Sequence, residues 1–304
     1  MENNEKGGIY DSMMDISKCK VNEQRLNMID NILNNSKDII YYYQVSPERK
    51  FIYLSKSVEA VLGHSLDLNY ENPLYVFENA HPDDVLKLER KASGEMDYSK
   101  SVITRWKHKD GNYLWMEDYP IPVYDEGANL VGVQGICRDI SEKVELEEKL
   151  KYLTSHDVFT GLRNRAYFDE QLKIYNNTNN TPIGLIICDL DNLKVINDSF
   201  GHDKGDLLIK NTSDLLLKLS DENKIIARLG GDEFGILIKN TSEFDVIDIY
   251  KKINAIISIY NTENKNFLIK LSIGHAFSET SLNTVDDVFK RADTNMYIDK
   301  KRNK

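Results

Sequence analysis

The sequence predicts an α+β protein whose two domains are joined by a helix. Three observations lead to this prediction. The chain has 304 residues, enough for two separate hydrophobic cores. Residues 38–141 are rich in aromatic side chains and short strand patterns, whereas residues 156–304 alternate strand and helix patterns. The segment between them, 139–154, is charged and contains neither glycine nor proline.

Composition and charge are those of an ordinary globular protein. Hydrophobic residues make up 41% of the chain, charged residues make up 29%, and the net charge is −10 at pH 7. A protein that binds a nucleic acid polymer needs a basic face, so this charge argues against such a partner. A single bound nucleotide is still compatible, because a metal ion can supply the positive charge.

The expected location follows from what the sequence lacks. No stretch approaches about 18 consecutive apolar residues, so we expect no membrane-spanning segment and no membrane partner. The first residues lack the basic start and apolar run of a signal peptide. Cys19, Cys137 and Cys188 lie far apart, as expected for thiols in a reducing compartment. We therefore expect a cytoplasmic protein.

The first domain is expected over residues 26–141, after an N-terminal extension of residues 1–25. Its strand patterns alternate with turns, and Lys109-Asp110-Gly111 is typical of a hairpin turn. Leu26, Ile29 and Leu33 would share one face of a preceding helix. The expected strands are 39–45, 50–55, 101–108, 112–124 and 130–140, and the expected short helices are 55–64 and 81–90.

Residues 142–155 form the predicted linker helix. Leu146, Leu150 and Leu153 recur at coiled-coil spacing, which favours pairing with a second copy of the chain. The alternative is a helix that packs against its own domain.

The second domain, residues 156–304, has the core order β-α-β-β-α-β. This order predicts a ferredoxin-like split βαβ sheet. A right-handed crossover makes its first two strands parallel, and the third strand then lies between them. The expected strands are 181–190, 223–229, 234–239 and 266–277, and the expected helices are 205–220, 243–260 and 284–301.

Two acidic motifs should meet at one rim of this sheet. The first strand ends in Asp189-Leu190-Asp191, and the turn between the second and third strands carries Asp232 and Glu233 after two glycines. Each motif alone could be an ordinary strand end or hairpin turn. Together, and with no histidine or cysteine beside them, they predict a site for Mg²⁺ or Mn²⁺. Two such ions can support phosphoryl or nucleotidyl transfer.

Five ordered blocks of the second domain closely resemble the GGDEF family of diguanylate cyclases. The resemblance implies that two GTP molecules condense into cyclic di-GMP and release two pyrophosphates. Each ribose 3′-OH would attack the other nucleotide's α-phosphate across a homodimer. The blocks are HDVFTGLRNRAYF (156–168), DLDNLKVINDSFGHDKGD (189–206), RLGGDEF (228–234), LSIGHAF (271–277) and ADTNMYIDKK (292–301).

The resemblance also implies residue roles at the metal site. Asp189, the Leu190 carbonyl and Asp232 or Glu233 would hold two Mg²⁺ or Mn²⁺ ions. Asp232 and Glu233 would be catalytic, with Glu233 helping to deprotonate the attacking 3′-OH.

Further residues would bind the nucleotide. By resemblance, Asn197 and Asp206 read guanine, and His202 contacts the nucleotide. Lys194 and Lys300 would contact phosphates. Without the family, Asn197 would be interpreted as a helix cap, His202 as a loop residue and the lysines as solvated. Guanine offers adjacent N1–H and N2–H donors that the Asp206 carboxylate can accept as a pair, so we expect guanine rather than adenine.

The sequence departs from the family at two places. The family's inhibitory product site has an R-x-x-D sequence, but residues 221–224 here read D-E-N-K. We therefore expect no inhibitory product site. The family often ends in glycine and arginine, but Asn303 and Lys304 occupy those places, and lysine lacks the bidentate fork of arginine.

The first domain resembles a PAS sensor domain. HPDD (81–84), the strands around Asp110-Gly111 and GICRDISEK (135–143) carry this resemblance. It implies a five-stranded antiparallel sheet with helices over one face, and an interior ligand that the sequence does not identify. We expect His64, His81 and His108 at the surface or in turns. We expect Trp106 and Trp115 to be sheet residues rather than a ligand cage.

The PAS domain and the linker helix would control a homodimeric cyclase. The alternative hypothesis is an inactive GGDEF domain that binds GTP or cyclic di-GMP as a regulator. An interaction scaffold would leave the paired acids unexplained.

Overall fold

The computed structural model describes residues 23–178, 180–265 and 267–302. The chain divides into two compact units, residues 1–147 and 148–304. The boundary between them falls within helix α6 (Ser141–Ser155). Some predicted features lie outside the described residues. They are Cys19, most of the predicted N-terminal extension, and the pair Asn303 and Lys304. In the ranges given above, every helix is too short or too polar to cross a membrane.

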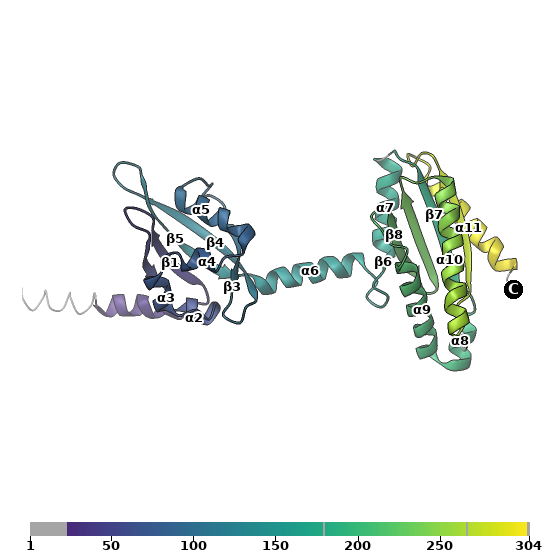
Figure 1. Cartoon of the computed structure of the whole chain (residues 1–304), viewed down its shortest axis with the longest axis horizontal. Helices are drawn as coiled ribbons and strands as arrows, with labels where there is room; N and C mark the ends of the chain where they lie inside the picture. Colours follow the sequence, from purple (N-terminus) through teal and green to yellow (C-terminus); the bar gives the residue numbers. More distant parts are fainter. Residues whose placement is uncertain (1–22, 179, 266, 303–304) are drawn as a thin grey trace, which may run out of the picture. The chain divides into compact units, whose positions relative to one another are not determined.

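The first unit contains a five-stranded antiparallel sheet in the order β2-β1-β5-β4-β3 (Figure 1). This is the sheet that the sequence predicts. Its strands are β1 (Ile39–Gln44), β2 (Lys50–Leu54), β3 (Val102–Lys107), β4 (Tyr113–Tyr124) and β5 (Leu130–Asp139). Its helices are residues 23–34, α2 (Ser57–Val61), α3 (Leu66–Glu71), α4 (Tyr75–Glu78), η1 (Pro82–Asp84) and α5 (Val85–Ser93).

Strand β1 shows why this sheet has one buried face. Ile39, Tyr41 and Tyr43 are buried, and the residues between them are half-buried, in the two-residue period of a strand. The predicted hairpin turn joins β3 to β4, where the Gly111 N–H donates to the His108 carbonyl. One expectation needs correction. His64 lies between α2 and α3 but is buried, and burial lowers its pKa.

The second unit contains a sheet in the order β10-β7-β9-β8-β6. Strand β9 pairs antiparallel with both β7 and β8, so these two are parallel and β9 lies between them, as predicted. The strands are β6 (Arg163–Asn164), β7 (Ile183–Leu190), β8 (Lys224–Gly230), β9 (Glu233–Lys239) and β10 (Leu271–Ser278). The helices are α7 (Arg165–Asn177), α8 (Leu193–Phe200), α9 (His202–Leu217), α10 (Glu243–Glu263) and α11 (Val285–Arg302).

Helices cover both faces of this second sheet. Residues of α9 and α10 share a core with Ile186 and Cys188 of β7, whereas residues of α7 and α11 share a core with Leu185 and Ile187. All eight residues of β7 are therefore buried, which explains its continuous apolar sequence. The sequence patterns predict no element at β6, α7 or α8, so these three are additions from the structure.

Gly274 of β10 allows α11 to lie close to the sheet. A Cβ atom at this position would lie 2.0 Å from the Met296 nitrogen and 2.1 Å from the Ala292 carbonyl oxygen. Such distances are impossible for non-bonded atoms, so only glycine permits this approach. The close packing fixes where the last turns of α11 lie relative to β7.

Candidate active site

The two acidic motifs meet at one rim of the second sheet. Asp189 of β7 is directly opposite Glu233 of β9 in the strand register. The Leu190 N–H donates to the Asp232 carbonyl oxygen at 2.9 Å. Asp189 is buried, with a side chain that is 7% exposed, while Asp232 and Glu233 are half-buried. The structure therefore brings Asp189 and Glu233 together, as the strand order predicts.

The two glycines shape the turn that carries Asp232 and Glu233. Gly231 has a φ of 46°, in the left-handed region that favours glycine, and Gly230 has a φ of 154°. A Cβ at either position would meet no atom within 4 Å. The turn therefore leaves open space beside its backbone, where a phosphate group could approach.

Arg228 holds this turn in shape. Its Nε and Nη2 atoms donate to the Gly231 carbonyl oxygen at 3.1 and 2.8 Å. Its Nη1 atom donates to Asp157 Oδ1 at 3.4 Å. Asp157 belongs to the HDVFTGL segment, so this arginine connects that segment to the acidic turn. Both residues lie in blocks that carry the family resemblance, but the sequence alone gives neither of them a role.

Asp157 is itself held by its neighbour Thr160. The Thr160 hydroxyl and N–H donate to Asp157 Oδ1 at 2.6 and 2.9 Å. Burial alone would raise the pKa of Asp157, but the Thr160 hydrogen bonds and the Arg228 charge outweigh it and lower that pKa. Asp157 thus stays ionised as the partner of Arg228.

Lys300 of α11 binds Asp189. Its Nζ atom lies 2.6 Å from Asp189 Oδ1. Burial raises the pKa of Asp189, and repulsion from Asp232 adds to this, although Lys300 opposes both. Burial tends to lower the pKa of Lys300, but its hydrogen bond to Asp189 and the charges of Asp189, Asp232 and Asp191 raise it overall. Lys300 was expected to contact phosphates of the nucleotide. In the structure its ammonium contacts the Asp189 carboxylate.

The donor set fits a hard divalent cation. Asp189 and Glu233 supply carboxylate oxygens, and neither histidine nor cysteine side chains line their pocket. Across the described residues, however, no three histidine, cysteine, aspartate or glutamate side chains are grouped as a ready-made metal site. The Lys300 ammonium supplies the cation at Asp189 instead. The pocket is lined by Asp189, Glu233, Asp293, Met296, Tyr297, Lys300 and Lys301.

A second group of predicted residues lies on α8 and α9. The Asn197 Oδ1 atom is buried and has no hydrogen-bond partner among the described residues. It packs over Gly205, where a Cβ would lie 1.9 Å away, and so lies beside the backbone of Asp206. Asp206 is exposed. The Asn197 side chain therefore packs against the residue that precedes Asp206 in the sequence.

His202 and Lys194 are not gathered into the pocket at Asp189. His202 is the first residue of α9, Lys194 is in the first turn of α8, and both are exposed. The structure therefore separates the predicted residues into a rim group on β7, β9 and α11 and a helix group on α8 and α9.

The D-E-N-K window forms a closed turn before β8. Lys224 forms an ion pair with Asp221, and the Asn223 N–H donates to Asp221 Oδ1 at 2.9 Å. The two side chains at the ends of the window therefore neutralise each other.

Comparison with known families identifies both units. Residues 154–304 match the family described as "Diguanylate cyclase, GGDEF domain", and residues 51–137 match the family described as "PAS fold". Residues 154–304 form a GGDEF domain. The first unit is a PAS domain. Both resemblances drawn from the sequence are confirmed.

Relatives of this GGDEF protein carry different names. The "Probable diguanylate cyclase DgcE" of Escherichia coli is 32% identical over 180 residues, covering 58% of this chain and 16% of the relative. The "Cyclic di-GMP phosphodiesterase PdeB" of Shewanella oneidensis is 32% identical over 175 residues, covering 56% of this chain and 20% of the relative. The chain thus spans a fifth or less of these two proteins.

Solved GGDEF domains also align with the chain. One is the coiled coil and GGDEF domain of DgcB from Caulobacter crescentus in complex with c-di-GMP. It is 22% identical, with a TM-score of 0.45, and the alignment covers 53% of this chain and 88% of that structure.

Proposed function

We propose that this protein is a diguanylate cyclase that condenses two GTP into cyclic di-GMP and two pyrophosphates. The observation that carries the proposal is the pairing of Asp189 with Glu233 at a rim beside an open glycine turn. The match of residues 154–304 to the diguanylate cyclase GGDEF family connects this pair of carboxylates with cyclase chemistry. The alternative is an inactive GGDEF domain that binds GTP or cyclic di-GMP as a regulator.

Asp189, the Leu190 carbonyl and Asp232 or Glu233 would hold Mg²⁺ or Mn²⁺, two ions per site. Bound ions would neutralise charge on the reacting phosphates. Glu233 is half-buried at the turn, where its carboxylate can accept the proton of the attacking ribose 3′-OH. The space beside Gly230 and Gly231 would admit the phosphates.

Lys300 would exchange partners when substrate binds. In the structure its ammonium neutralises the buried Asp189 carboxylate. With Asp189 engaged in holding a metal ion, the Lys300 ammonium would leave this carboxylate and pair with the anionic phosphates of the nucleotide. Lys194 and His202 would add further nucleotide contacts from α8 and α9.

Asn197 and Asp206 would recognise guanine. A carboxylate can accept the guanine N1–H and N2–H donors together, and adenine lacks this pair of donors. The Oδ1 atom of Asn197 has no hydrogen-bond partner among the described residues and would offer an additional acceptor if its side chain turned toward a ligand.

The active form would be a homodimer joined through α6 and the PAS domain. The product contains two equivalent 3′→5′ bonds, which suits two facing sites related by two-fold symmetry. No residue of α6 is buried, and Leu146, Leu150 and Leu153 are 57%, 62% and 42% exposed. Pairing with a second helix would cover these leucines, which supports pairing over packing within one copy.

The first experiment incubates the purified chain with GTP and Mg²⁺ and identifies the products by mass spectrometry. The Glu233→Gln variant, which keeps the size of the side chain, is the control. Cyclic di-GMP from the unaltered protein alone would support the proposal. GTP that binds but does not react, even after forced dimerisation of residues 156–304, would overturn it in favour of a regulator.

A further inference from the structure

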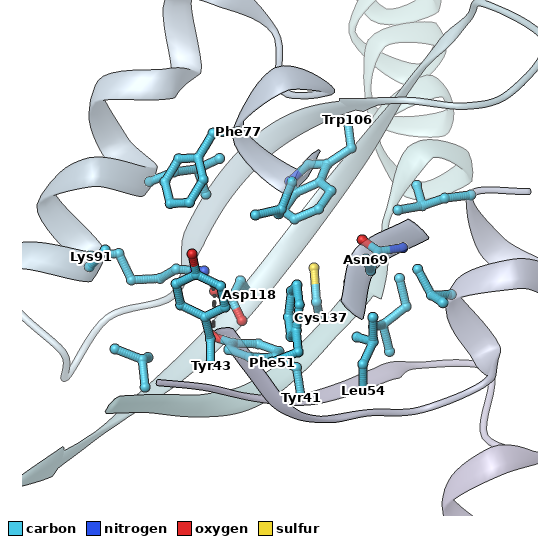
Figure 2. A pocket seen from close by; sticks show the side chains of 17 residues that line it. Tyr41, Tyr43, Phe51, Leu54, Asn69, Phe77, Lys91, Trp106, Asp118 and Cys137 are labelled. Carbon is cyan, nitrogen blue, oxygen red and sulfur yellow. Dashed lines mark hydrogen bonds and ion pairs between the residues drawn. The ribbon is translucent and has the colours of Figure 1, made fainter. Parts of the chain in front are cut away.

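Each unit contains a buried aspartate whose carboxylate is paired with a lysine of a neighbouring helix. In the PAS domain, Lys91 Nζ of α5 lies 2.8 Å from Asp118 Oδ2 (Figure 2). In the GGDEF domain, Lys300 Nζ of α11 lies 2.6 Å from Asp189 Oδ1. The chemistry of the two pairs is the same, but the helices that carry the two lysines are held in different ways.

The helix that carries Lys91 is held by the hydrophobic core. Leu88 and Ala92, which lie close to Lys91 on α5, are both buried. Helix α11 is held in this way only as far as Met296, because none of its described residues after Met296 is buried. The last turn of a helix frays when nothing holds it. Lys300 therefore lies on a helix end that needs some contact other than hydrophobic packing.

Polar side chains of α11 supply such contacts at the edge of the second sheet. Strand β10 is the last strand in the sheet order, so alternate residues direct their backbone N–H and carbonyl groups away from β7. The Arg291 Nη2 atom donates to the Phe277 carbonyl at 2.9 Å. The Asn295 Nδ2 atom donates to the His275 carbonyl at 3.0 Å.

A third contact, between Asp299 and Ile273, continues this series. The Ile273 N–H donates to Asp299 Oδ2 at 3.0 Å. The three side chains follow one another at intervals of four residues, which is a rise of about 6 Å along a helix. Their partners follow at intervals of two residues, which is about 6.6–6.8 Å along a strand. Because the two spacings nearly match, the three contacts together fix the position of α11 along its own axis.

Asp299 is the member of this series that lies closest to the acidic rim. It directly precedes Lys300 in α11 and is half-buried. Its partner Ile273 directly follows Ser272, which is opposite Asp189 in the strand register. Of the three side chains, Asp299 alone lies in the last turn, beyond the buried part of α11. Its contact with Ile273 therefore holds this turn at the place where Lys300 reaches Asp189.

We propose that Asp299 is a positioning residue, which holds the last turn of α11 on β10 while Lys300 exchanges Asp189 for the phosphates of the nucleotide. The contact of Asp299 is a property of the fold, whereas the exchange of partners rests on the proposed function. Once Lys300 leaves Asp189, this ion pair no longer holds the turn. The contact between Asp299 and Ile273 remains, so the ammonium moves by rotation of its own side chain and the helix keeps its last turn.

Amide hydrogen exchange in the full chain, without nucleotide, tests the contact itself. Asp299→Ala removes the acceptor of the Ile273 N–H, and we expect this amide to exchange at least about tenfold faster. Asp299→Asn keeps an acceptor oxygen and should stay within about threefold of the unaltered protein. Asn295→Ala is the matched control, because it shortens a neighbouring side chain that contacts His275 instead. Unchanged exchange at Ile273 in Asp299→Ala would overturn the proposal.

The effect on Lys300 is tested with a GTP analogue that has a methylene group between its α- and β-phosphorus atoms, so that no product forms. Its affinity is measured by titration calorimetry with Mg²⁺ present. We expect Asp299→Ala to weaken binding about fivefold in the unaltered protein but not in Lys300→Met, because Asp299 acts through Lys300. Asp299→Asn should bind like the unaltered protein. Equal weakening in both backgrounds would show that Asp299 does not position Lys300.

The outcome for Asp299 can be told apart from the outcome for the cyclase. A chain that binds the analogue but never forms cyclic di-GMP from GTP would overturn the cyclase, while the affinities would still decide the role of Asp299. A chain that does not bind the analogue would overturn the exchange of partners by Lys300. The exchange rate of the Ile273 amide decides the structural contact in every case.

Discussion

At the level of single residues, the most informative contact is the 2.6 Å ion pair between Lys300 and Asp189. The partners are far apart in the sequence, and one of them belongs to the metal site that the carboxylates predict. The ammonium neutralises the buried carboxylate. In the proposed enzyme it would also compete with a metal ion for Asp189, so we expect Lys300 to affect metal binding before any nucleotide is present.

Replacing Lys300 with methionine should strengthen metal binding in the absence of nucleotide. Removing one positive charge beside Asp189 removes both the competitor and its repulsion of the ion. We expect Mn²⁺ to bind at least threefold more tightly, as measured by titration calorimetry without GTP. Lys301→Met is the matched control, because Lys301 lies over the Tyr297 ring. Weaker or unchanged Mn²⁺ binding in Lys300→Met would contradict the proposed exchange of partners.

Replacing Asp206 with serine should relax the choice of base. Serine cannot accept the guanine N1–H and N2–H pair as a carboxylate does. We expect a mixture of GTP and ATP to yield dinucleotides that contain adenine, detected by mass spectrometry. The same mixture with the unaltered protein should yield cyclic di-GMP alone. Identical products from the two proteins would refute the role of Asp206.

The elements show which parts of the fold were predictable. The pairing of Asp189 with Glu233 follows from strand order, because a split βαβ sheet always brings these strand ends together. Helix α8 was not predicted, since it is short and follows β7 after a two-residue connection. The partner of Lys300 could not be derived from the sequence either, because it depends on how closely α11 approaches β10.

The close approach of α11 should make Gly274 intolerant of substitution. Alanine would place its Cβ 2.0 Å from the Met296 nitrogen, so the helix must move away from the sheet. We expect Gly274→Ala to lower the free energy of unfolding by about 2 kcal/mol, measured by urea unfolding of the second unit. It should also weaken the contact of Lys300 with Asp189. A loss below about 0.5 kcal/mol would show that the helix adapts freely.

Helix α6 should be sensitive to its rotational phase. Two residues inserted within 144–150 rotate the following part of the helix by about 200°, which misaligns the leucine stripe. We expect cyclase activity to change at least tenfold in a pyrophosphate-release assay. An insertion of seven residues restores the stripe and serves as the control. Equal activity in all three proteins would refute coupling through this helix.

At the level of the whole molecule, the sequence indicated two folded units of different composition, and the structure contains them. The central position of β9 between β7 and β8 was also predictable, because it follows from the split βαβ topology, whereas the strand order of the first sheet was not predicted from the sequence. The second helical layer of the GGDEF sheet was only partly predictable. An uninterrupted apolar strand such as β7 indicates burial on both faces, but not which helices provide the cover.

The proposed cyclase should not be inhibited by its product through the 221–224 window. Asp221 and Lys224 neutralise each other there, and the R-x-x-D sequence is absent. We expect initial rates to be unchanged by added cyclic di-GMP. The double variant Asp221→Arg, Lys224→Asp reverses the ion pair, creates R-x-x-D and should become inhibited. Strong inhibition of the unaltered protein would show that another product site exists.

The contact from Arg228 to Gly231 and Asp157 has a consequence for genetics. The shape of the acidic turn depends on a segment that lies 71 residues earlier in the chain. A random screen for inactive alleles would therefore return substitutions at Asp157 and Thr160, in protein that still folds and accumulates normally. Such alleles would map away from the nucleotide, and revertants should arise at residues that hold the turn by other means.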